Sequence, residues 1–210
     1  MTSFNLKTVV ALAGALAWTG SGMALNGSVQ AADGAAKAMA VASEVCAGCH
    51  GFDGNSVAPG FPKLAGQQNV YLLREMKDYK SGKRASEIMA PFMAALSEED
   101  LTHLAAYYAK QKPAPGVVNN PKLLAVGKNL YLKGNSKTDV PSCDSCHEED
   151  GTGSGKFPRV AGQHTEYTLD QFRLYATGKR TNGARVMQAV AERMSEEESR
   201  AVAEYMASMP

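Results

Sequence analysis

Apolar positions in this sequence recur at three- and four-residue spacings, which is the period of an amphipathic helix. The pattern is clearest over residues 68–80 and 164–176, where Tyr, Leu, Met and Phe follow that spacing. Two further segments, 35–45 and 121–132, are rich in Ala, Leu and Lys and also favour helix. No segment alternates apolar and polar residues for long enough to predict a strand, so the expected fold class is all-α.

Two more helices are predicted from their start signals. Ser97 and Ser195 have the character of N-cap residues, and acidic residues follow each of them directly. A serine side chain at the N-cap accepts a hydrogen bond from a backbone N–H of the first turn, and acidic side chains there favour the positive end of the helix dipole. We therefore expect a helix to begin after Ser97 and another after Ser195.

The chain contains a tandem duplication. Four sequence blocks occur twice in the same order: Cys46–His50 with Cys143–His147, Phe61–Gln67 with Phe157–Gln163, Gly82–Arg84 with Gly178–Arg180, and Leu96–Glu99 with Met194–Glu197. The displacement between partners stays between 96 and 98 residues along the whole series. Such a consistent order of matched blocks indicates one structural unit present in two copies.

The two copies are separated by a connector that contains three prolines and a glycine, which predicts an extended segment. We expect domains at residues 32–112 and 122–210, with a linker at 113–121. Domains of about 80–95 residues are small for an independent hydrophobic core and usually need a disulfide, metal or cofactor.

The first 31 residues have the features of a secretory signal peptide. Lys7 precedes a ten-residue apolar stretch at 9–18, and small and polar residues follow it. Cleavage is expected after Ala31, and cleavage after Ala24 or a retained N-terminal anchor are the alternatives. The segment therefore predicts an exported protein.

Composition and charge narrow the class of protein further. The chain has 210 residues, of which 44% are hydrophobic, and its formal net charge is +1. This apolar content excludes a wholly disordered chain. Acidic and basic side chains also balance within each copy, so nothing suggests nucleic-acid binding, which requires a strongly basic surface.

All four cysteines lie in two Cys-x-x-Cys-His motifs, formed by Cys46, Cys49 and His50 and by Cys143, Cys146 and His147. Two disulfides, a redox-active dithiol or a shared zinc site are the alternatives. A histidine directly after each cysteine pair favours attachment of c-type haem instead. Within one helical turn both thiols can form thioethers to the porphyrin while the histidine reaches the iron from the same side. We therefore predict two covalently bound haem c groups.

A matched pair of methionines supplies candidates for the second iron ligand. Of the ten methionines, only Met89 and Met187 pair between the copies, 39 and 40 residues after His50 and His147. The other methionines that can be paired face a different apolar residue in the other copy, as core positions do. We expect ligation by His50 with Met89 and by His147 with Met187. The alternative is that these two methionines also belong to the core.

Other matched residues are candidates for supporting roles. The carbonyl groups of Pro62 and Pro158 could accept a hydrogen bond from the ligand histidines and fix their orientation, or the prolines could simply form turns. Arg84 and Arg180 are the matched basic residues best suited to bind a haem propionate, with a solvated charge pair as the alternative.

Two further groups of residues are assigned structural roles. His103 and His164 have no histidine counterpart in the other copy, so we expect them at the surface. Four matched aromatic residues are expected to pack in the haem pockets, namely Phe61, Phe157, Tyr71 and Tyr167.

The tandem haem motifs, the two Phe-Pro-[Lys/Arg]-x-Ala-Gly-Gln segments and the paired methionines resemble the cytochrome c4 family of dihaem periplasmic electron carriers. The resemblance covers essentially the whole chain after the signal. It implies two class I cytochrome c domains related by pseudo-twofold symmetry, with haem propionates facing each other across the interface. It also implies electron transfer from quinol–cytochrome c reductase or another donor to a terminal oxidase, often close to the membrane surface.

The sequence departs from this family in the helix that precedes the first haem motif. The second copy has Gly127 and Tyr131 for contact with its closing helix, whereas the first has an Ala- and Met-rich segment at 38–42, which leaves that contact open. The second copy also inserts residues 134–140 before its haem motif.

If a histidine and a methionine both bind each iron, no coordination site is left for a substrate, which indicates an electron carrier rather than an enzyme. The carrier is expected to be a monomer or a weak dimer. The alternative is the dihaem subunit of a larger redox enzyme, such as flavocytochrome c sulfide dehydrogenase. A dihaem peroxidase is disfavoured because it needs an open iron and a longer chain.

Overall fold

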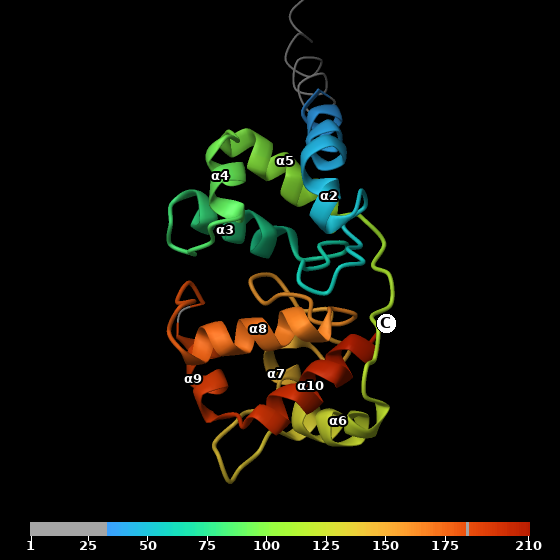
Figure 1. The fold of residues 1–210 in the computed structure, drawn as a ribbon, viewed down its shortest axis with the longest axis vertical. Coiled ribbons are helices and arrows are strands. Elements are labelled where there is room, and N and C mark those ends of the chain that lie inside the picture. The colour runs from blue at the N-terminus through green and yellow to red at the C-terminus, as the bar shows by residue number, and fades with distance from the viewer. Residues whose placement is uncertain (1–32, 184) are drawn as a thin grey trace, which may run out of the picture.

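The computed structural model describes residues 33–183 and 185–210, so the expected signal peptide at 1–31 lies outside the described residues. The chain forms two helical domains, one for each copy of the duplication, joined by an extended segment along one side (Figure 1). Among the described residues, no helix has the length and apolar character needed to cross a membrane.

The first domain begins with a helical run over residues 33–50, in which residues 42–46 adopt π-helical geometry. Its further elements follow in order and are η1 Ala42–Cys46, α2 Ala47–His50, α3 Asn69–Lys80, α4 Met89–Ala94 and α5 Glu98–Ala109.

The second domain repeats this order of helices. Its elements are η2 Pro121–Leu123, α6 Leu124–Lys133, α7 Asp144–His147, α8 Thr165–Ala176, α9 Val186–Arg193 and α10 Glu196–Ser208. Among the described residues, β-type pairing is confined to two isolated bridges of the second domain, Asn135–Val140 and Ser154–Phe157. The expected all-α class is therefore confirmed.

The helices predicted by periodicity and by start signals are present. The segments 68–80 and 164–176 correspond to α3 and α8. Both closing helices, α5 and α10, begin with a capping box in which the serine side chain accepts from a backbone N–H three residues on, and the acidic side chain there accepts from the serine N–H. The short helices α4 and α9 were not predicted from the sequence.

Each domain has a separate hydrophobic core. In the second domain, buried residues of α6, α8 and α10 pack together, among them Tyr131, Phe172 and Val202. The core of the first domain is smaller and contains Leu72 and Leu104. Two small cores of this kind agree with the expectation that each copy needs a bound group for stability.

The first and last helices are in contact in both domains, although the sequence did not predict this contact for the first domain. A Cβ atom at Gly127 would lie 2.0 Å from the carbonyl oxygen of Ala201, so α6 and α10 approach closely there. In the first domain a Cβ atom at Gly34 would lie 2.0 Å from the ring of His103. His103 is half-buried rather than fully exposed, because its ring also covers the helix at Gly34.

The linker is held by hydrogen bonds to both domains. The Asn55 side chain donates to the carbonyl of Lys112 at 3.0 Å and accepts from the N–H of Ala114 at 2.7 Å. Further along, the N–H of Asn119 donates to the buried carboxylate of Glu204 at 2.8 Å. These bonds fix the path of the connector between the domains.

The inserted loop of the second domain is anchored at the start of the last helix. Backbone hydrogen bonds between Asn135 and Val140 close the loop. The side-chain amide of Asn135 donates to the carboxylate of Glu198 at 2.7 Å, at the capping box of α10. The insertion therefore packs onto the closing helix of its own domain.

Candidate functional site

The two haem motifs end on corresponding short helices, α2 and α7, whose last residue is the motif histidine, and the first cysteine of each motif directly precedes its helix. The four cysteines are free and half-buried, so the alternative of a disulfide framework is wrong. Within 33–183 and 185–210, no group of three or more His, Cys, Asp or Glu side chains could hold a metal ion. This disfavours the zinc alternative for the described part of the chain.

The histidines of both motifs are buried and held in the same way. Nδ1 of His50 lies 2.9 Å from the carbonyl oxygen of Pro62, and Nδ1 of His147 lies 2.9 Å from that of Pro158. These are the contacts that the spacing of the two prolines suggested. A donating Nδ1–H fixes the tautomer that leaves the lone pair on Nε2, which is the form that binds a metal.

Burial also favours the neutral form of both rings. Desolvation lowers the pKa of His50 and of His147 below the ordinary value, although the hydrogen bond to the proline carbonyl opposes this shift. A neutral imidazole is the form that coordinates iron. An aromatic ring also packs edge-on against each histidine, with Phe61 at 6.3 Å from His50 and Phe157 at 6.5 Å from His147 between centroids.

One cavity of about 560 Å³ lies between the domains and is lined by residues of both. Both motif histidines and both matched methionines contribute to its wall. Met89 opens α4, where its N–H donates to Oγ of Ser86 at 3.0 Å, and Met187 lies in the first turn of α9. The unpredicted helices α4 and α9 are thus the elements that present the two methionines.

Three other methionines, Met76, Met93 and Met206, also line the cavity. Their counterparts in the other copy are Phe172, Ala191 and Tyr108, which supply no thioether. The cavity therefore fits a haem in each domain: an imidazole with a free Nε2, a thioether sulfur and free thiols on the adjoining helix form the appropriate donor set.

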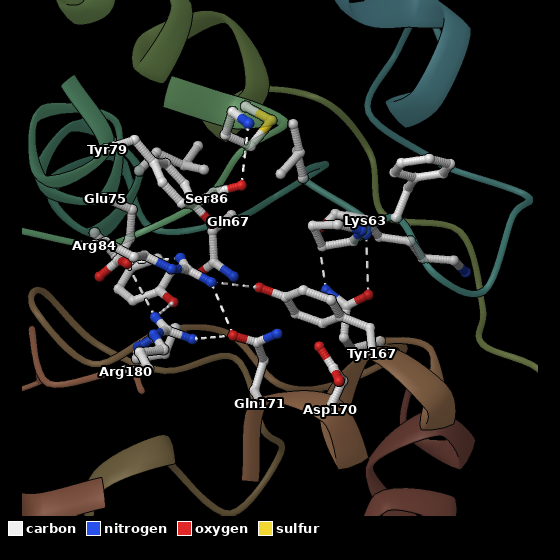
Figure 2. A pocket seen from close by; sticks show the side chains of 18 of the residues that line it. Lys63, Gln67, Glu75, Tyr79, Arg84, Ser86, Tyr167, Asp170, Gln171 and Arg180 are labelled. Carbon is white, nitrogen blue, oxygen red and sulfur yellow. Dashed lines mark hydrogen bonds and ion pairs between the residues drawn. The ribbon is translucent and has the colours of Figure 1, made fainter. Parts of the chain in front are cut away.

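Arg84 and Arg180 lie together at the domain interface rather than in solvent. They are 7% and 4% exposed, so the alternative of a solvated charge pair is wrong. Both guanidinium groups donate to the same carboxylate oxygen, Oε2 of Glu75, at 2.7 and 2.9 Å (Figure 2). Both residues line the cavity, where a propionate could reach them.

Tyr71 and Tyr167 connect this cluster across the interface in addition to lining the cavity. The hydroxyl of Tyr167 accepts from Arg84 at 3.1 Å, and that of Tyr71 accepts from Arg180 at 2.9 Å. Each arginine therefore contacts the tyrosine of the opposite domain.

A second set of reciprocal contacts joins the loops that follow the two prolines. The side-chain amide of Gln163 bonds to both backbone groups of Lys63, and that of Gln67 bonds to both backbone groups of Arg159. Both glutamines are buried. Reciprocity of this kind is what pseudo-twofold symmetry requires.

The prediction that His164 is a surface residue is wrong. Its side chain is 6% exposed, and Nε2 lies 2.9 Å from the carbonyl oxygen of Ser56 in the other domain. Its counterpart Gln68 donates to the carbonyls of Thr152 and Gly153, both at 3.0 Å. The two residues therefore hold equivalent places at the interface, although their chemistry differs.

Some of the missed interface residues recur in the repeat. Gln67 and Gln163 close the second matched block, so their recurrence could have marked them. Glu75 gave no such signal because its counterpart is Gln171.

Comparison with known proteins extends this picture. The sequence pattern of the Cytochrome c family matches the chain twice, over residues 35–112 and 124–210. Cytochrome c4 of Pseudomonas aeruginosa is 40% identical over 188 residues, which is 88% of this chain and 92% of that protein. The crystal structure of reduced cytochrome c4 from Pseudomonas stutzeri superimposes with a TM-score of 0.79 at 36% identity, covering 86% of this chain and 98% of that one.

A relative of a different description is also similar. The thiosulfate dehydrogenase electron acceptor of Stutzerimonas stutzeri is 37% identical over 174 residues, which is 80% of each chain.

Proposed function

Because this chain belongs to the cytochrome c family, and within it to the dihaem cytochromes c4, we propose that it carries electrons between periplasmic redox proteins and catalyses no reaction of its own. The observation that carries the proposal is that both domains place a histidine and a methionine at the wall of one shared cavity. An imidazole and a thioether that both bound one haem iron would leave no coordination site for a substrate. This arrangement favours electron transfer over chemistry at the metal.

The protein binds two haem c groups covalently, one in each copy of the duplication. We assign these domains to residues 32–112 and 122–210. The thioether bonds are assigned to Cys46 and Cys49 in the first and to Cys143 and Cys146 in the second. When bound, each haem supplies a one-electron ferric–ferrous couple.

The chain's own residues hold and orient the redox centres. We assign the iron ligands to the pairs His50 with Met89 and His147 with Met187. The carbonyls of Pro62 and Pro158 keep each imidazole in one tautomer and orientation, because they accept the Nδ1–H bond. A ligand that is held rigidly costs little rearrangement when the charge of the iron changes.

The basic residues at the interface are assigned to the propionates. Arg84 and Arg180 line the cavity and are buried, where a guanidinium–carboxylate bond is strong. Since the cavity is continuous between the domains, the two haems are expected to lie close to one another and to exchange electrons directly.

The partners proposed are a respiratory donor such as quinol–cytochrome c reductase and a terminal oxidase as acceptor. Export by the N-terminal segment would place the chain in the periplasm, with peripheral association with the membrane surface and a monomeric or weakly dimeric state. The relative described as an electron acceptor of thiosulfate dehydrogenase favours a second candidate, in which the chain serves a redox enzyme directly as its cytochrome.

The proposal is tested on the purified holoprotein. An alkaline-pyridine spectrum should show two haems c per chain, and Met89→Ala and Met187→Ala should each remove the near-infrared sulfur-to-iron band of one haem. A band that survives both substitutions would contradict the assigned ligands. Stopped-flow mixing with a quinol–cytochrome c reductase, a terminal oxidase and a thiosulfate dehydrogenase then separates the two candidate functions.

A further inference from the structure

The arginine cluster at the interface is nearly symmetric. Arg84 and Arg180 occupy positions 96 residues apart, and the same displacement relates Tyr71 to Tyr167. Each arginine donates to the tyrosine of the opposite domain, at 3.1 and 2.9 Å. The pseudo-twofold axis between the domains therefore relates these four side chains.

Between the two arginines the symmetry is broken where the first domain has Glu75 and the second has Gln171 (Figure 2). Oε2 of Glu75 accepts from Arg84 at 2.7 Å and from Arg180 at 2.9 Å. Oε1 of Gln171 accepts from the same two residues, at 2.9 and 2.7 Å. The two side chains thus make equivalent hydrogen bonds and differ by one negative charge.

The contacts outside the arginine pair are also unequal. The amide of Asn182 donates to Glu75 at 2.8 Å and to Asp78 at 2.8 Å, while Arg74 approaches the other oxygen of Glu75 at 2.9 Å. Asp78, whose counterpart is Leu174, is a second carboxylate of the first domain at this cluster, and it lies 3.6 Å from the exposed amine of Lys83. Glu75 is the carboxylate that both Arg84 and Arg180 contact and that an amide replaces in the other domain.

The carboxylate of Glu75 lies in a buried place, where its charge is weakly screened. The residue is 4% exposed and lines the cavity that both candidate haem sites share. Burial raises the pKa of its carboxyl, but the positive charges of Arg180 and Arg84 outweigh this, so the pKa lies below its usual range and the group is ionised at neutral pH. A buried charge is screened far less than one in water.

We propose that the exchange of carboxylate for amide between Glu75 and Gln171 makes the two haem sites inequivalent, and that Glu75 sets part of the difference between their reduction potentials. The proposal rests on the dihaem function proposed above. A negative charge stabilises the ferric over the ferrous state, and it does so more strongly at the nearer iron. Gln171 occupies the matched position with respect to the other iron and exerts no such effect.

The symmetry allows a test in which the charge is removed, doubled or moved. Glu75→Gln leaves an amide at both positions, and Gln171→Glu places a carboxylate at both. The first variant should raise both potentials and the second should lower both. Both variants should shift the difference between the two reduction potentials in the same direction, because each variant places the same kind of side chain at positions 75 and 171.

The double variant Glu75→Gln/Gln171→Glu moves the carboxylate without changing the net charge. Its mean potential should stay near that of the parent, while the difference between the haems changes by about the sum of the two single effects. We expect each single change to alter the ratio of electron occupancies by about tenfold, equivalent to 59 mV for a one-electron couple. The readout is a spectroelectrochemical titration, with the haems distinguished by their NMR methyl resonances.

Glu99→Gln is the matched control, since it removes a carboxylate from an exposed position of the first domain. This control variant should leave the difference between the two reduction potentials unchanged. Equal shifts at both haems in the two single variants, or an unchanged difference in the double variant, would overturn the proposal. If Glu75→Gln fails to fold, Gln171→Glu and the double variant still decide, because both keep a carboxylate beside the arginines.

This outcome is separable from the proposed function. If the variants bind two haems c per chain and keep their near-infrared bands, the proposed dihaem function stands whether or not their reduction potentials change. A parent protein without two haems would remove the proposed function itself.

Discussion

The side-chain amide of Gln163 in the second domain pairs with both backbone groups of Lys63 in the first. Oε1 accepts from the Lys63 N–H at 2.9 Å, and Nε2 donates to the Lys63 carbonyl at 3.0 Å. Lys63 directly follows Pro62, whose carbonyl accepts the His50 hydrogen bond. One domain therefore holds the loop that orients the candidate iron ligand of the other.

Replacing this glutamine should loosen both the interface and the ligand loop. Gln163→Ala leaves a backbone N–H and a carbonyl without their partners, which costs about 1–3 kcal/mol for a buried group. We expect a loss of that size in the free energy of unfolding, measured by denaturant titration. By pseudo-symmetry, Gln67→Ala should lose a similar amount at Arg159.

Gln188→Ala serves as the control for this experiment. Gln188 bonds only to Glu192 on its own helix at 2.9 Å, so its loss should change the stability little. Equal stabilities for Gln163→Ala and Gln188→Ala would show that the interdomain amide pair contributes nothing.

The buried interface histidine should make stability depend on pH. Burial lowers the pKa of His164 and nearby Lys63 lowers it further, while the bond to Ser56 and the charge of Glu166 oppose the shift. Because the unfolded chain takes up this proton at a higher pH, the folded state should lose stability as the pH falls below about 6.5. Denaturant titrations between pH 8 and pH 5 measure this decline.

The repeat itself supplies the variant that tests the origin of this decline. His164→Gln installs the residue found at the matched position, Gln68, which bonds to carbonyls of the opposite domain without titrating. The decline should be smaller in His164→Gln than in the parent. An identical pH profile in the two proteins would assign it to other groups.

Close helix contact should make the second domain sensitive at one glycine. In Gly127→Ala the new Cβ would meet the backbone carbonyl of Ala201, which cannot move without shifting α10. Overpacking of this kind costs about 1–3 kcal/mol, to be read as a lower unfolding midpoint. In Gly34→Ala the neighbour is the side chain of His103, which can turn away, so a smaller loss is expected.

Gly48→Ala is a helical control with open space around the new methyl group. It should keep or slightly raise the stability, because alanine favours helix over glycine. If Gly127→Ala were as stable as Gly48→Ala, the two helices would have to be further apart than they are here.

The capping boxes of the closing helices should contribute measurably. Ser97→Ala and Ser195→Ala each remove the side chain that accepts from the third N–H of the helix, at 3.1 Å in both domains. A loss of about 1 kcal/mol is typical of such a change, and thermal unfolding followed by circular dichroism detects it. Ser208→Ala, near the opposite end of α10, is the control and should have a smaller effect.

Much of the fold could be predicted from local features of the chain. Periodicity located α3 and α8, and Ser97 and Ser195 marked the starts of α5 and α10. The helices α4 and α9 escaped prediction because six and eight residues are too few to establish a period. Their positions depend on packing around the cavity rather than on their own sequence.

Matching the two copies identified recurring residues but not their surroundings in the fold. Matched residues such as Arg84 and Arg180 were recognised as candidates, but matching does not say whether a residue is buried or what it touches. Unmatched residues were misjudged for the same reason: His164 and Glu75 lie buried at the interface because the opposite domain covers them.

By itself, the sequence determined the duplication, the helical class, the haem motifs and the matched methionines, because these depend on covalent chemistry and on spacing along one chain. Only the tertiary structure decided how the two copies meet. Hydrogen bonds such as those from Arg84 and Arg180 to Glu75 join residues far apart in sequence. The bonds exist because two folded surfaces exclude water from one another, and no local pattern records which surface will face which.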